Sequence, residues 1–225
     1  MSSRLRSSTR ASTVASESLA ETETKVRGET TRKTTAVRSP KGNELARLKR
    51  IALAAFLLSL TIIVGVIYFS VHEVIRLAPS SIRAETLKGF SARAEYALRY
   101  QTLLFGWLVF NVYAVIFTRL RRGALNPLVD STEKHAQQMK NILTNSMEQI
   151  FLSSMLQLAF ASFAEPTLFK NLVPAVNIVQ FFGRIAFFFG YPYYRTLGYT
   201  LTSVPNTLML VYNLYKFGSY LGLYW

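Results

Sequence analysis

Residues 145–163 read NSMEQIFLSSMLQLAFASF, a stretch apolar enough to lie in a membrane that nevertheless contains the carboxylate of Glu148. An ionised carboxylate in hydrocarbon is costly unless it has a partner or a hydrated site. On a helix, side chains spaced by three or four residues share one face. The polar residues of this region form two adjoining faces: Gln138, Asn141, Asn145 and Glu148, and beside them Ser146, Gln149, Ser153 and Gln157. About half of this helix is thus polar and must face a helix bundle or a cleft.

Apolar segments of membrane-spanning length extend on both sides of this helix. A spanning helix needs about 20 mainly apolar residues. The sequence predicts five spans, at residues 51–71, 101–118, 142–164, 168–191 and 199–218. The fold class is therefore an all-α membrane protein.

The first fifty residues have the opposite composition. They carry twelve Lys and Arg, five Glu and many Ser and Thr, without a long apolar run. Such a segment cannot bury a core and is expected to be disordered. The chain has a formal charge of +14, but no basic fold or aromatic stacking platform accompanies these charges, so we predict no nucleic-acid partner.

Cysteine and histidine usage excludes other chemistry. There is no cysteine, which removes disulfides, thiol nucleophiles and thiolate metal sites. His72 and His135 have no partner at metal-ligand spacing, so no metal site is predicted.

Charge at the ends of the apolar segments predicts the topology. Arg47, Lys49 and Arg50 precede the first span, and Arg119, Arg121 and Arg122 follow the second. Clusters of this kind favour the cytosol, and two spans between them allow both to lie there. We expect residues 1–46 to form a cytosolic head, 47–72 an extra transmembrane helix, 73–95 a lumenal loop and 96–225 a four-helix domain. The C-terminus is then lumenal or extracellular.

Depth suggests a partner for Glu148. At about 1.5 Å per residue, it lies roughly 9 Å into its span and Arg184 roughly 10 Å into the next, counted from the same membrane side. Their opposite charges predict an intramembrane pair within one subunit. One role for this pair is to fix which helices are neighbours, and the other is to form the floor of a cytosolic polar cleft.

The stretch GYPYYRTLGYTLT, residues 190–202, supplies further polar groups at the cytosolic end. A guanidinium beside hydroxyl groups suits a ligand that bears a carboxylate. Alternatively, Arg195 obeys the positive-inside bias and the tyrosines form an interfacial aromatic belt.

The order of these elements resembles the membrane-associated proteins in eicosanoid and glutathione metabolism, the MAPEG family. The resemblance covers about residues 96–218 and is carried by RLRRGALNP, NSMEQ, GRIAFFFGY and RTLGYTLTSVP. It implies a four-helix bundle, here preceded by one extra helix, and a homotrimer. It also implies a cytosol-facing glutathione cleft between subunits, with ligand contacts at Asn145, Glu148, Tyr191, Arg195, Thr196 and Tyr199. Arg195 matches the arginine that activates the glutathione thiol.

The chain departs from the enzymes of that family at two cations. Asn141 and Thr144 stand where the enzymes and the prostaglandin-forming members, respectively, carry arginine. The extra helix and the head resemble the mattrin-like branch, which is associated with secretory and lysosomal trafficking and with receptor abundance. One hypothesis is therefore a non-catalytic protein of endomembranes (ER, Golgi or lysosome) that contacts membrane-protein clients. The second is a glutathione-dependent transferase or peroxidase acting on a lipophilic electrophile, with Arg195 as its catalytic residue. A transporter is a weaker third, because no internal repeat is visible.

Overall fold

The structure is a computed structural model that describes residues 42–123 and 134–223. The chain divides into two compact units, Met1–Leu45 and Ala46–Trp225, and the fold described here is that of the second. The expected disorder of the head, apart from its last five residues, lies outside the described residues. Trp225 also lies outside the described residues, so the lumenal or extracellular position of the C-terminus stays a prediction.

The described residues form five α-helices and one short 3-10 helix, joined by turns and loops. The helices are α2 (Gly42–Val71), η1 (Ala84–Leu87), α3 (Phe90–Arg122), α4 (Lys134–Phe163), α5 (Pro166–Gly190) and α6 (Thr196–Tyr220). Each predicted span lies within or largely within one of these helices, so the all-α prediction is confirmed. By length and composition, α2, α3 and α5 can each cross a membrane. Helices α4 and α6 are as long, but the polar residues that run along them leave neither with a stretch as apolar as those of α2, α3 and α5.

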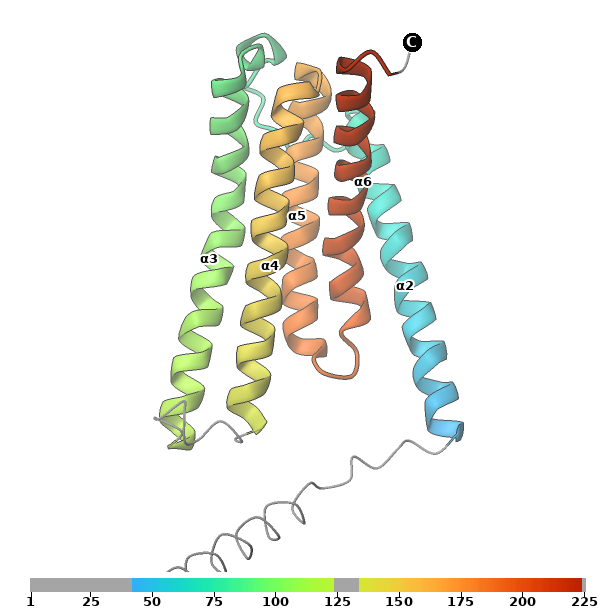
Figure 1. Ribbon diagram of the computed structural model, residues 1–225, viewed down its shortest axis with the longest axis vertical. Helices are drawn as coiled ribbons and strands as arrows, with labels where there is room; N and C mark the ends of the chain where they lie inside the picture. The colour runs from blue at the N-terminus through green and yellow to red at the C-terminus, as the bar shows by residue number, and fades with distance from the viewer. Residues whose placement is uncertain (1–41, 124–133, 224–225) are drawn as a thin grey trace, which may run out of the picture. The chain divides into compact units, whose positions relative to one another are not determined.

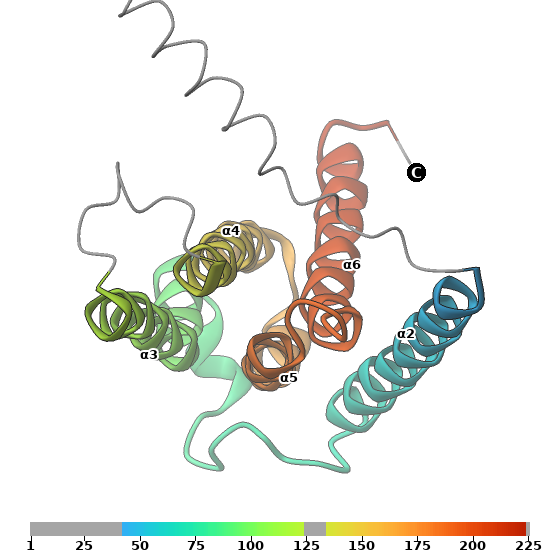
Figure 2. The same ribbon diagram turned by 90° about the horizontal axis from the view of Figure 1, so that it is seen from below.

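The last four helices form a bundle in which successive helices run in opposite directions (Figure 1). Helix α3 packs on α4 and α5, and α6 packs on α5 and α4. The view along the bundle shows α3 beside α4, and α6 packs on both α4 and α5, so that the helices follow one another around the bundle in the order α3, α4, α6, α5 (Figure 2). The chain is thus an all-α membrane protein with a four-helix bundle that follows one additional helix.

Helix α2 contacts the bundle through side chains. Ile63 is almost fully buried and clusters with Val179 of α5 and Leu201 of α6. In Figure 2, α2 lies on the α6 side of the bundle, away from α3. The extra helix therefore leaves the outer faces of α3 and α4 uncovered.

Two glycines allow α6 to approach α5 closely. A Cβ placed on Gly198 would lie 2.2 Å from the backbone N of Phe187 and 2.5 Å from the carbonyl O of Gly183. A Cβ on Gly183 would lie 2.9 Å from the Cβ of Leu201. Small residues at such crossings let membrane helices pack backbone to backbone. The approach places Arg184 of α5 and Thr202 of α6 within hydrogen-bond reach.

The bundle interior has an apolar end and a polar middle. At the end where α5 begins, aromatic side chains close the core, with Phe160 stacked on Phe169 at 5.6 Å between ring centroids. Further along, amides link three helices. The hydroxyl of Ser153 donates to Gln180 Oε1 over 2.7 Å, and Gln180 Nε2 donates to Asn206 Oδ1 over 2.7 Å. In hydrocarbon such groups need internal partners. This network therefore accounts for the polar face of α4 on which Ser153 lies.

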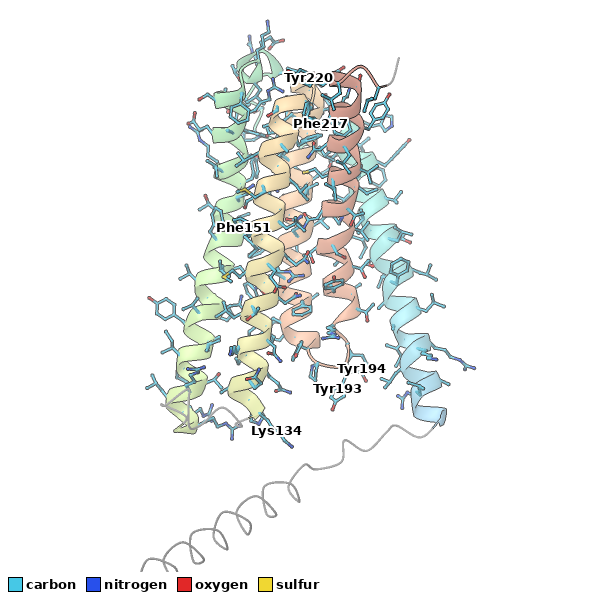
Figure 3. The ribbon with its side chains drawn as sticks, in the orientation of Figure 1. Lys134, Phe151, Tyr193, Tyr194, Phe217 and Tyr220 are labelled. Carbon is cyan, nitrogen blue, oxygen red and sulfur yellow. The ribbon has the colours of Figure 1, made fainter. Side chains whose placement is uncertain are left out.

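Aromatic side chains mark both ends of the helices. Tyr193 and Tyr194 project from the α5–α6 turn at the end where α4 begins with Lys134, and Phe217 and Tyr220 lie at the opposite end (Figure 3). Exposed aromatic residues at both ends are typical of the two membrane–water interfaces.

Candidate functional site

A polar cleft of about 740 Å³ opens between the first half of α4 and the turn that joins α5 to α6. Its walls come from three helices and one turn, and most of the lining side chains carry a charge, an amide or a hydroxyl. The lining residues are Gln137, Lys140, Asn141, Thr144, Asn145, Glu148, Phe187, Tyr191, Arg195, Thr196 and Tyr199.

The cleft contains the residues that the sequence singled out as one group. Asn145, Glu148, Tyr191, Arg195, Thr196 and Tyr199 all line it. Their convergence follows from the turn at residues 191–195, which is too short to separate the ends of α5 and α6.

One face of α4 supplies half of the lining. Gln137, Asn141, Thr144 and Glu148 are spaced by four, three and four residues, which is the repeat of a single helical face. Serine and glutamine side chains on the adjoining face, such as Ser153 and Gln157, turn into the core instead. The two polar faces of this helix therefore have different tasks.

Tyr191 is held at the mouth of the cleft from two sides. Asn141 Nδ2 donates to the Tyr191 Oη over 3.2 Å, and Gln137 Nε2 donates to Asn141 Oδ1 over 3.0 Å. The guanidinium carbon of Arg195 lies 5.9 Å from the centroid of the Tyr191 ring, within the range of a cation–π contact. Arg195 is also the residue that directly precedes α6 and is exposed to the cleft.

Arg184 lies beneath the cleft, in the core, with 1 % of its surface exposed. Its Nη1 donates to Asn145 Oδ1 over 2.9 Å, and its Nη2 donates to the Thr202 hydroxyl. The guanidinium carbon also lies 4.9 Å from the centroid of the Phe187 ring. Arg184 thus ties α5 to α4 and to α6 just below the ligand-accessible space.

The predicted Glu148–Arg184 ion pair does not form within this chain. Among the described residues the one ion pair joins Glu95 and Arg99, and Glu148 is exposed in the cleft. Depth along a helix sets the level of each charge in the membrane but not the direction in which its side chain points around the helix axis. Instead, Asn145, three residues before Glu148, accepts a hydrogen bond from the guanidinium of Arg184. The carboxylate of Glu148 is therefore available to a ligand or to a neighbouring molecule.

Sequence reasoning missed three lining residues, Gln137, Lys140 and Phe187. Lys140 precedes Thr144 by four residues, so the helical repeat that identified the polar face could also have found it. Its ammonium gives the cleft a second cation beside Arg195, against the single carboxylate of Glu148. With the buried charge of Arg184 below, the cleft has an excess of positive charge and suits an anionic ligand.

A model of the MAPEG family matches residues 97–215, which is more than half of the 225 residues. The matched region begins in α3 and ends in α6, so it coincides with the four-helix bundle and leaves α2 outside. No curated protein and no solved structure shows significant similarity to the chain.

Proposed function

Because the chain belongs to the MAPEG family, whose model covers the whole cleft, we propose that it is a non-catalytic, mattrin-like member of that family. In this proposal it is a multi-pass protein of the endomembranes that acts through contacts with other membrane proteins. Its role lies in secretory or lysosomal trafficking, or in the control of receptor abundance. The cleft then has a structural or ligand-sensing role and carries out no turnover.

The observation that carries the proposal is the neutral character of two lining positions. Asn141 and Thr144 both face the cleft. By the resemblance to the family, its enzymes carry arginine at the position of Asn141, and the prostaglandin-forming members carry a second arginine at that of Thr144. A tripeptide with two carboxylates needs cations there, because each charge-assisted hydrogen bond contributes about 1.5–3 kcal/mol. Asn141 is further committed to Tyr191 through its side-chain amide.

One observation favours a second candidate, a glutathione-dependent transferase or peroxidase that acts on a lipophilic electrophile. Lys140 and Arg195 give the cleft two cations, which could hold carboxylates or a thiolate. In such an enzyme Arg195 would stabilise the glutathione thiolate, since a nearby cation lowers the pKa of a thiol. Its place beside Tyr191 leaves the guanidinium open to the cleft.

An activity assay separates the two candidates. Purified parent protein and the Arg195→Ala variant are tested for glutathione conjugation and for peroxidase activity, with the electrophile 1-chloro-2,4-dinitrobenzene and with cumene hydroperoxide. We expect no turnover above the uncatalysed rate from either protein, and the same oligomer from both. Robust turnover that Arg195→Ala abolishes would overturn the non-enzyme proposal in favour of the second candidate.

The oligomer that we propose is a homotrimer, as the resemblance to the family implies. Two features of α4 support it. Met147, Phe151 and Met155 form an exposed apolar stripe along this helix (Figure 3 labels Phe151). Glu148 stands next to that stripe and forms no ion pair with the described residues of its own chain. A neighbouring subunit on this face would cover the apolar side chains and close the cleft.

A further inference from the structure

A second cavity lies where α3 ends and α4 begins, and it shares no lining residue with the polar cleft. Its volume is about 370 Å³. It is lined by Phe117, Thr118, Arg121 and Arg122 of α3 and by His135 and Met139 of α4. Because α3 and α4 pack directly on each other, the two walls are held in place by the bundle itself.

The described lining of this cavity is basic. Arg121 and Arg122 are permanent cations, and no acidic side chain is among the lining residues that the structure describes. Neither guanidinium makes a hydrogen bond or an ion pair with the described residues, where the one ion pair is that of Arg99. Both side chains are exposed, so their donors are accessible to a ligand.

The cavity also has an apolar half on the membrane side. Phe117 lies one helical turn before Arg121, about 6 Å nearer the centre of the span, and it is 64 % exposed. Met139 stands in the same relation to His135 on α4, one turn further into that helix. Cations at the helix ends followed by apolar side chains reproduce the order of headgroup and acyl chain in a bilayer leaflet.

We propose that this cavity binds the phosphate-bearing headgroup of an anionic membrane lipid. Arg121 and Arg122 would hold the phosphate oxygens, since guanidinium offers paired donors to phosphate. Phe117 and Met139 would contact the first carbons of the lipid tails. Basic pockets between membrane helices are suited to such headgroups. The simpler view, that these arginines only obey the charge bias of cytosolic loops, gives no role to the cavity and no preference among the arginines of this cluster.

Arg119 provides a matched control, because it belongs to the same basic cluster but does not line the cavity. The full chain is purified in detergent, and its affinity for dioctanoyl phosphatidylinositol 4-phosphate is measured. Dioctanoyl phosphatidylcholine and free inositol 1,4-bisphosphate serve as competing ligands. We expect Arg121→Gln to weaken binding of the anionic lipid about tenfold or more and Arg119→Gln to change it less than twofold.

A third variant tests the cavity without changing charge. Met139→Trp fills the apolar half and should weaken lipid binding about tenfold while every cation remains. Equal losses in Arg119→Gln and Arg121→Gln, or unchanged binding in Met139→Trp, would overturn the proposal. So would binding of the free headgroup as tight as that of the lipid, because the site would then recognise a soluble anion. The elution volume of each variant in size-exclusion chromatography shows whether it is folded. If an arginine variant is misfolded, the binding measured with Met139→Trp decides the test.

Discussion

Replacing Gly198 with alanine should disrupt the contact on which the cleft depends. The new Cβ would lie 2.2 Å from the N, and 2.6 Å from the Cα, of Phe187, whereas ordinary contacts begin at 3.4 Å. Both atoms belong to a helix backbone, which cannot rotate away as a side chain would. Helix α6 must therefore move from α5 by about 1 Å. Overpacking typically costs 1–3 kcal/mol, and we expect about 3 kcal/mol here because only backbone can yield.

The assay is thermal unfolding of the purified protein in detergent. For a chain of this size, about 3 kcal/mol corresponds to a lower melting temperature by roughly 6–12 °C. Gly183→Ala should cost less, since its new Cβ would lie 2.9, 3.0 and 3.2 Å from its nearest neighbours, Leu201 Cβ, Thr202 Cγ2 and the carbonyl O of Gly198, which is a smaller overlap. Gly106→Ala is the control: nothing lies within 4 Å of its new Cβ, and alanine favours a helix by up to about 1 kcal/mol.

The order of the three variants matters more than any single value. The close approach predicts that Gly198→Ala is the least stable, Gly183→Ala intermediate and Gly106→Ala at least as stable as the parent. If Gly198→Ala has the same melting temperature as the parent, the crossing of α5 and α6 is not as described. The placement of the cleft would then be wrong as well.

Three other expectations concern the core charges and the topology. Gln180→Leu should lower stability by about 1–2 kcal/mol, because it removes the acceptor of the Ser153 hydroxyl and the donor to Asn206 Oδ1, and unchanged unfolding would contradict the polar network. Glu148→Gln should change the unfolding free energy by less than about 0.5 kcal/mol, whereas Arg184→Met should cost about 1–3 kcal/mol, since Arg184 is buried and donates to Asn145 and Thr202 while Glu148 is exposed. A larger loss of stability in Glu148→Gln than in Arg184→Met would instead support an ion pair between the two residues. Protease protection of microsomes should digest an N-terminal tag and protect a C-terminal one, and a protected N-terminal tag would refute the cytosolic head.

Helix number and cleft composition could be predicted from the sequence because both depend on local periodicity. The apolar runs set the five helices, and spacings of three and four residues placed Asn145 and Glu148 on one face. The family resemblance then indicated that Tyr191 and Arg195 meet that face, which the cleft shows.

The partner of Arg184 could not be predicted in the same way, because it depends on rotation of one helix against another. Equal depth left several candidates at one level, and Asn145 and Thr202 are the ones that the α5–α6 crossing brings into reach. That crossing is set by Gly198, whose role becomes visible only when its distance to Phe187 is known.

We propose that neutral residues in the cleft prevent tight glutathione binding, and restoring the missing cations tests this. Glutathione affinity is measured by calorimetry on the parent and on the Asn141→Arg, Thr144→Arg double variant, both of which keep Lys140 and Arg195. We predict weak or undetectable binding to the parent and a gain of on the order of a hundredfold or more in the variant, from two added charge-assisted contacts. Tight binding to the parent, with no gain in the variant, would contradict the account.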